Sequence, residues 1–451
     1  MASQTKQMTS GSPARLLVAF ALPLMLGNIF QQLYTVVDTA VVGKALGVGA
    51  LAALGATDWL YWLLLGIIQG LTQGFAILMA QEFGANRPDR LRKAVGGAIL
   101  LSAAGAAALV LLGQLMARPA LVFMQTPDAI IGSSLLYLRI MFAGIPIVMA
   151  YNLLASILRS LGDSKTPLLA MIVAALLNIV LDLLFVLVFH WGIAGAAAAT
   201  LLAQLVSGLF CLKRVLGIEL LQLTASDLRL TGRLAGKLLA LGFPMAFQNT
   251  VIAVGGMIVQ LVVNRCGVIF IAGFTATNKL YGILEVAATS YGYAMTTYVG
   301  QNLGAGKIER IRRGVRTAHG IALLTSLVIA AVMLCTGRLI LSLFLSGSAE
   351  EVAGAMDVAY RYLALMSIGL PVLYYLHITR SAIQGTGNTF LPMLSGVAEF
   401  IMRTSSAIVL PIFFPEESVM FAEVIAWLGA DIVLAVSYPI VLRRISAENT
   451  G

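Results

Sequence analysis

Runs of about twenty apolar residues follow one another along the whole chain, and they restrict the fold more than any other feature. The stretch LLVAFALPLMLGNI (16–29) has no charged residue, and only 11% of the 451 residues are charged, against roughly 25% in soluble proteins. In a bilayer only helices and closed barrels satisfy all of their own backbone hydrogen bonds. Runs of this length indicate helices, so the sequence predicts an all-α polytopic membrane protein.

Twelve transmembrane helices are predicted from the apolar runs and from the Gly, Pro and charged residues between them. Their approximate bounds are 15–42, 53–81, 95–118, 134–158, 167–190, 193–213, 238–264, 273–300, 316–340, 358–380, 391–413 and 419–442.

The formal net charge of +9 has a topological explanation. Lys and Arg gather in the segments NRPDRLRK (86–93) and KIERIRRGVR (307–316) and in the pair RR (443–444). An even number of spans with both ends inside places all three on the cytoplasmic side, as the positive-inside rule requires. We therefore expect a plasma (inner) membrane protein with cytoplasmic termini, and no nucleic-acid partner.

Catalytic and metal-binding patterns are not found in the sequence. The three cysteines and three histidines are scattered, with no CxxC pair and no metal-ligand spacing. Neither a Walker A segment nor HExxH nor GxSxG is present. The sequence predicts neither an enzyme nor a resident cofactor, and it indicates no obligate protein partner.

The chain contains an internal repeat. Gln81, Gly84, Ala85, Arg90, Arg92 and Val95 recur as Gln301, Gly304, Ala305, Arg310, Arg312 and Val315. Pro23 and Asn28 likewise recur as Pro244 and Asn249. Six spans followed by six in the same order give two halves of equal orientation, a parallel repeat typical of transporters. We predict lobes at 14–213 and 238–442, joined by a cytoplasmic segment at 214–237.

Several of these motifs resemble the multidrug and toxic compound extrusion (MATE) transporters. The similar elements are the first span with Pro23, Asn28 and Asp38, the Q-x-x-G-A element, RSLGDSKTP (159–167) and NIVLD (178–182). NIVLD is similar to the prokaryotic DinF-like and archaeal members. The resemblance implies two six-helix lobes around a central cavity and efflux exchanged against protons or sodium.

Four polar residues of the first half are the candidate site. Asn178 and Asp182 are four residues apart on one helix face, and Asp182 lies about 26 Å along its span. Asp38 and Thr200 fall at a similar depth in the outer half of the membrane. The resemblance implies that the matching positions form the cation-coupling site.

Burying two acids in hydrocarbon is costly, which favours a functional role over simple packing. Two neighbouring carboxylates cannot both ionise cheaply, so the pair should take up a proton, or bind Na⁺ through its oxygens. For Thr200 alone, a hydrogen bond to its own helix is the simpler interpretation.

The second half lacks this constellation. Val259, Arg403 and Ala407 stand at the repeat positions of Asp38, Asn178 and Asp182, so the coupling site is predicted in the first half only. Glu399 and Arg403 are spaced for an ion pair within one helix. Glu285 has no partner in its own helix.

Glu285, Arg403 and Tyr34 are candidates for the substrate pathway. Tyr34 lies one helical turn before Asp38 and could stack on a cationic substrate or pack in the core. Gly66, Gly70 and Gly74 predict a close helix–helix contact.

The sequence thus predicts a secondary antiporter of a bacterial or archaeal plasma membrane that exports amphipathic cationic drugs or toxins in exchange for H⁺ or Na⁺. The alternative is a flippase for lipid-linked oligosaccharides or other lipids in the same superfamily, which would favour a basic cavity.

Overall fold

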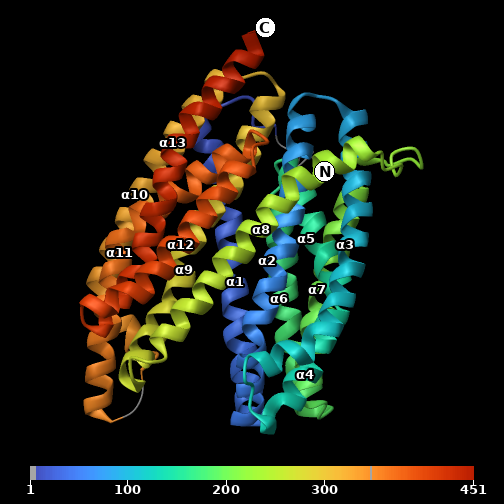
Figure 1. The fold of residues 1–451 in the computed structure, drawn as a ribbon. Helices are drawn as coiled ribbons and strands as arrows, with labels where there is room; N and C mark the ends of the chain where they lie inside the picture. The colour runs from blue at the N-terminus through green and yellow to red at the C-terminus, as the bar shows by residue number, and fades with distance from the viewer. Residues whose placement is uncertain (1–6, 346–347, 451) are drawn as a thin grey trace. The chain divides into compact units, whose positions relative to one another are not determined.

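The computed structural model describes residues 7–345 and 348–450, and it is built from long helices (Figure 1). At positions 33–36, 39, 40, 48, 51, 416, 417, 449 and 450 only the backbone is described. No β-strand occurs in these described ranges, which confirms the predicted all-α class.

The helices follow one another with short connections. In order they are α1 (Pro13–Leu46), α2 (Val48–Gly84), α3 (Pro88–Phe123), α4 (Asp128–Ala143), α5 (Ile145–Ser160), α6 (Lys165–Asp182), the π-helix η1 (Leu183–Val188), α7 (Gly192–Leu216), the short η2 (Glu219–Leu221), α8 (Gly232–Val263), α9 (Val268–Gly304), α10 (Ile308–Leu341), α11 (Ala349–Gly385), α12 (Phe390–Phe413), η3 (Glu416–Phe421) and α13 (Ala422–Thr450).

The prediction of twelve membrane spans is not confirmed by helix length and composition alone. Within the described residues, ten helices are long and apolar enough to cross a bilayer, or eleven if α4 and α5 form one bent span. The predicted span 134–158 corresponds to that pair, bent by 47° at Gly144, where Pro146 in the first turn of α5 has no N–H to continue the preceding helix. The predicted span 273–300 lies in α9, which is long but too rich in polar residues to qualify.

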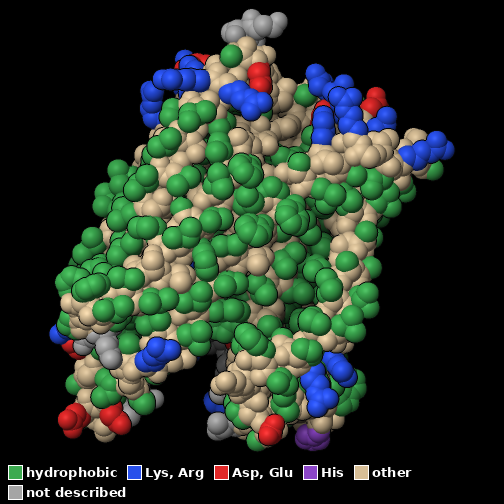
Figure 2. Space-filling model, in the orientation of Figure 1, with side chains coloured by type: hydrophobic (Ala, Val, Ile, Leu, Met, Phe, Trp, Pro, Cys, Tyr) green, Lys and Arg blue, Asp and Glu red, His purple; other side chains and the backbone are tan. Residues whose placement is uncertain are grey.

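Figure 2 shows hydrophobic side chains along the length of the helices, whereas Lys and Arg gather near helix ends. Many large apolar side chains are exposed, among them Phe123 at 89% and Leu343 at 81%. Apolar side chains of this size are stable facing lipid and costly facing water. The chain is therefore a multi-pass membrane protein.

The chain forms two compact units. The first is built mainly from Leu22–Ala246, and the second from Thr9–Ala21 together with Phe247 onward. The beginning of α1 thus packs in the second unit, and the beginning of α8 packs in the first. The division into two six-helix lobes at 14–213 and 238–442, which was inferred from the internal repeat, stays a prediction.

Glycines permit a close contact between α2 and the beginning of α8 in the first unit. A Cβ atom on Gly70 would lie 2.4 Å from the backbone of Ala246, and one on Gly74 would lie 2.3 Å from the Cα of Gly242. No real Cβ approaches backbone atoms so closely, so only glycine fits both positions. The predicted contact is confirmed for these two glycines.

We expect Gly74→Ala to destabilise the first unit by about 1–3 kcal/mol, because the added methyl group must push two helix backbones apart. Thermal unfolding of the purified protein in detergent measures this effect. Gly132→Ala is the matched control, since a Cβ there meets nothing within 4 Å and alanine favours a helix. Equal melting temperatures for the two variants would contradict the contact.

Candidate cation-coupling site

Four helices of the first unit bring three acids and one hydroxyl group to a similar depth. Asp38 in α1 precedes the turn at Gly47, and Asp58 in α2 follows it; Asp182 and Thr200 similarly flank the turn at Trp191. Each of the four lies roughly two and a half to three helical turns from its connection. Because the paired helices run antiparallel, equal distances from a turn mean equal depth.

Asp38 and Asp182 face each other. Their carboxyl groups lie within hydrogen-bonding reach, and each is the main charged neighbour of the other. Asp182 is fully buried, whereas Asp38 is half-buried. Two neighbouring carboxylates repel each other, so a proton or another cation between them would stabilise the pair.

Asn178 is also buried in the first unit, one helical turn before Asp182. Four buried atoms here make no hydrogen bond with any described residue: the Oδ1 and Nδ2 atoms of Asn178 and both carboxylate oxygens of Asp182. Leaving such groups unsatisfied costs about 1–3 kcal/mol each. A bound cation would satisfy the three oxygens, whereas the Asn178 Nδ2 group is a donor and needs an acceptor.

Thr200 donates its hydroxyl hydrogen to the carbonyl of Ala196, 3.1 Å away in the same helix. This bond within α7 agrees with the simpler interpretation, in which Thr200 only hydrogen-bonds to its own helix. The hydroxyl oxygen can still accept a hydrogen bond or coordinate a cation through its lone pairs. Its place in the site stays a prediction.

A π-helix begins directly after Asp182. The segment η1 replaces the α-helical continuation of α6, and Phe189 donates from its N–H to the carbonyl of Leu184, five residues back. Single π turns occur frequently at functional sites. The apolar sequence LLFVLV of η1 contains no signal for it.

Asp58 is an acid that sequence reasoning missed. It lies in α2, is exposed, and its charge interacts with that of Asp38. Its position in the sequence could have identified it. Asp58 follows Gly47 by nearly as many residues as Asp38 precedes it, so the two acids lie at a similar depth on the paired helices. No ion pair with a described residue neutralises Asp38, Asp58 or Asp182, so the cluster is strongly acidic.

Arg403 lies in a separate network in the second unit. The predicted pair with Glu399 is present, at 2.9 Å, and a second acid, Glu423 of α13, lies 2.8 Å from the same guanidinium nitrogen. Arg380 of α11 contacts the other oxygen of Glu399 at 2.7 Å. Arg403 further donates to the carbonyl of Ile252 at 3.1 Å.

Glu285 finds its partner outside its own helix. The His377 Nε2 atom in α11 lies 3.4 Å from a carboxylate oxygen of Glu285, and both side chains are partly exposed. The side chain of Tyr34 lies outside the described residues. Roles for these three pathway candidates stay predictions.

No described group of three or more His, Cys, Asp and Glu side chains has the geometry of a metal centre. A sodium site of the kind predicted would combine carboxylate oxygens with those of Asn178 and Thr200.

Long apolar helices, an internal repeat and acids buried between helices together define a polytopic membrane transporter. The MatE family model matches residues 23–184 and 244–409, once in each half. The chain therefore belongs to the MatE family, as the sequence motifs indicated.

Known proteins support this placement. The chain is 32% identical over 303 residues to the protein named "Probable multidrug resistance protein YpnP" of Bacillus subtilis (strain 168), covering 67% of this chain and 68% of that one. It is 23% identical over 429 residues to "Probable multidrug resistance protein NorM" of Thermotoga maritima, covering 92% and 89%. A solved MOP superfamily transporter from Pyrococcus furiosus has the same fold, with a TM-score of 0.90, 22% identity and 99% coverage of both chains. The protein is thus similar to multidrug efflux transporters, and family members are transporters rather than enzymes.

Proposed function

We propose that this protein is a secondary antiporter that exports amphipathic cationic small molecules in exchange for H⁺ or Na⁺. The coupling ion binds at Asp38, Asn178, Asp182 and Thr200 in the first unit. The observation that carries the proposal is the pair of neighbouring carboxyl groups, Asp182 fully buried and Asp38 half-buried, with the unsatisfied amide of Asn178 beside it.

Ion binding changes the charge of this site, and this change could couple ion binding to a change in helix packing. Two facing carboxylates repel each other and lose hydration when buried. A proton or a sodium ion between them removes part of both costs, so the helices that carry them can pack more closely. An antiporter needs such a difference between its ion-bound and ion-free states.

The charge distribution favours cationic substrates. Asp38, Asp58 and Asp182 give the site in the first unit a local excess of negative charge that attracts cations. In the second unit, Arg403 is matched by Glu399 and Glu423, so its charge is neutralised within the protein. That arrangement offers no excess positive charge for an anionic lipid-linked substrate.

We also assign the helix ends that carry the Lys and Arg clusters to the cytoplasm of a bacterial or archaeal cell. In the second unit the beginning of α10 and the end of α13 lie together, since Arg312 donates to the Ser446 hydroxyl at 3.0 Å. The basic residues of both helix ends thus share one side of the membrane, consistent with the positive-inside rule.

Purified protein in liposomes tests the function. Efflux of a fluorescent cation is measured first with a pH gradient alone, and then with a sodium gradient alone. The proposal expects transport driven by one of the two gradients and none without a gradient. Transport that proceeds equally without either gradient would rule out ion-coupled antiport.

Asp58→Asn is expected to weaken cation binding without abolishing transport. Removing one exposed charge near the site costs about 1 kcal/mol, which corresponds to roughly a fivefold loss of affinity. Titration of the cation that drives transport measures the change. The exposed Asp128 at the beginning of α4 provides the control, since Asp128→Asn removes a charge at the end of a helix. Equal titrations for both variants would exclude Asp58 from the site.

A further inference from the structure

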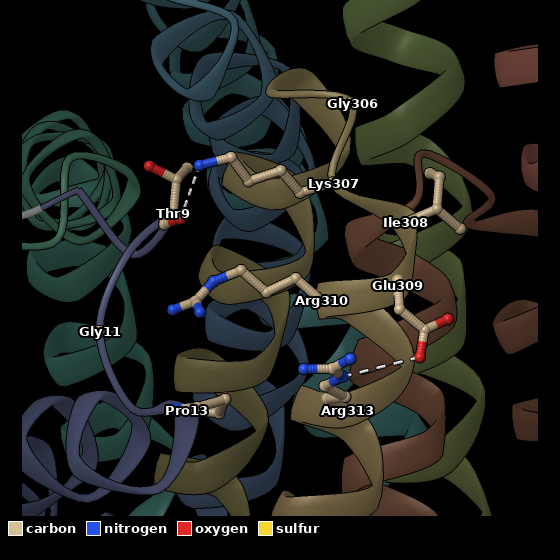
Figure 3. A pocket seen from close by; sticks show the side chains of 9 residues that line it. All are labelled: Thr9, Gly11, Pro13, Gly306, Lys307, Ile308, Glu309, Arg310 and Arg313. Carbon is tan, nitrogen blue, oxygen red and sulfur yellow. Dashed lines mark hydrogen bonds and ion pairs between the residues drawn. The ribbon is translucent and has the colours of Figure 1, made fainter.

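A basic cavity lies at the beginning of α10 in the second unit. It has a volume of about 630 Å³, and its lining includes Lys307, Arg310 and Arg313, with Thr9 and Gly11 from the segment that precedes α1. Figure 3 shows the side chains of Lys307 and Arg310 extending toward that segment. Three cations and one acid give the lining an excess of positive charge.

The acid of the lining is already engaged. Glu309 lies 3.7 Å from the Nε atom of Arg313 and 3.5 Å from Arg312. Lys307 donates to the carbonyl of Thr9 at 2.8 Å, a neutral acceptor that leaves its charge uncompensated. The guanidinium of Arg310 lies over the ring of Tyr298, at 5.6 Å from the ring centre, which holds the side chain at the cavity.

The first half of the repeat shows what an equivalent cluster contacts. There the segment preceding α8 packs on the beginning of α3, so closely that a Cβ on Gly96 would lie 2.2 Å from the carbonyl oxygen of Asp227. The Asp227 carboxylate lies 3.8 Å from Arg92, the repeat counterpart of Arg312. Backbone and side-chain hydrogen bonds from Thr224 hold the pKa of Asp227 below its ordinary value, so the carboxylate stays charged.

In the second half, the described part of the segment that precedes α1, residues 7–12, brings no carboxylate to α10. The segment MASQTKQMTSGS (1–12), which precedes α1, contains no acidic residue. The cations of α10 therefore meet a cavity where those of α3 meet the Asp227 segment. A basic surface needed only for topology would not have to enclose a cavity.

We propose that this cavity binds a phosphate group, which supplies a negative charge to the cations of α10 as the Asp227 carboxylate does to those of α3. Lys307, Arg310 and Arg313 supply N–H donors, and guanidinium groups match phosphate geometry. This end of the helices is assigned to the cytoplasmic membrane surface, so the headgroup of an anionic phospholipid is the most accessible source of phosphate. Basic pockets at that level of the membrane bind such headgroups. A soluble phosphate ester would supply the same chemistry. The proposal does not depend on the coupling ion or on the exported substrate.

The test is a titration of the purified full-length protein in detergent, with the melting temperature as the readout. The probes are dihexanoyl phosphatidylglycerol, dihexanoyl phosphatidylcholine, glycerol 1-phosphate and inorganic phosphate. A saturable rise with phosphatidylglycerol alone identifies the lipid as the source. A rise of similar size with the two soluble phosphates identifies a soluble ester; either result supports the site.

Two variants locate the binding. In the double variant Arg310→Gln with Arg313→Gln, the apparent affinity should fall about thirtyfold, at about 1 kcal/mol per cation. Ser10→Asp places an exposed carboxylate between two lining residues, Thr9 and Gly11, and should weaken the response while keeping all cations. The matched control, Arg87→Gln with Arg90→Gln, removes two exposed cations from the first half and should titrate as the unmodified protein does.

Two results would overturn the proposal. One is a titration of Ser10→Asp that equals that of the unmodified protein. The other is a control that loses as much affinity as the cavity variant, because binding would then reflect the charge of the whole surface. Melting temperatures without any probe establish that each variant is folded.

Discussion

Asp182→Asn and Asp38→Asn are each expected to reduce ion-driven efflux to the level of protein-free vesicles. Each change keeps the size of the side chain and removes the group that binds a proton or attracts a sodium ion. An amide beside the remaining carboxyl group no longer repels it, so ion binding loses the free-energy difference that couples it to substrate release. Proteoliposome efflux under the gradient that drives the unmodified protein gives the measurement.

Two controls are needed: one shows that the Asn variants are folded, and the other shows that the effect is specific to the first half. The melting temperature should stay the same or rise in both Asn variants, because a carboxylate repulsion is removed. Val259→Ala alters the repeat counterpart of Asp38 in the second half and should leave the ion dependence of transport intact. Near-normal efflux in either Asn variant would refute the assignment of the coupling site, and a loss of ion dependence in Val259→Ala would place coupling in both halves.

Glu399→Gln is expected to destabilise the second unit by about 3–5 kcal/mol, the usual cost of breaking a buried ion pair by removing one partner. Glu399 lies between Arg380 and Arg403 and accepts a short contact from each. A neutral side chain leaves Arg380 without its carboxylate, and it leaves Arg403 with Glu423 alone. Thermal and chemical denaturation in detergent measure the loss.

A compensating variant separates charge balance from general damage. Arg380→Met combined with Glu399→Met removes one positive and one negative charge and keeps the Arg403–Glu423 pair. This double variant should recover much of the stability lost in Glu399→Gln, since well-packed apolar side chains can replace a buried pair. Asp357→Asn, at an exposed pair with Arg361, should cost less than about 1 kcal/mol. No recovery in the double variant would show that Glu399 acts through packing and not through charge.

Sequence patterns predict those parts of the molecule that depend on one helix at a time. The spacing of Asn178 and Asp182 already places them on one face, and the glycines of α2 already indicate a close contact. The pair of Glu399 and Arg403 follows from the same helical period. Each of these predictions needs only the 3.6-residue repeat of a single element.

Apart from the shared depth of Asp38, Asp182 and Thr200 and the glycine contact, features that depend on the packing of separate helices were not predicted. Glu423 comes to Arg403 from α13, and His377 comes to Glu285 from α11, so neither contact has a spacing that can be read along the chain. Asp58 was missed because its neighbour Asp38 lies across a turn. The count of twelve spans is not confirmed at α9, where the helix is long but many of its side chains, polar ones included, are buried.

The unequal composition of the two units has a consequence for how such a repeat can originate. The beginning of α1 completes the second unit, and the beginning of α8 completes the first. A half-length ancestor could not have covered its own core with its own first helix in this way.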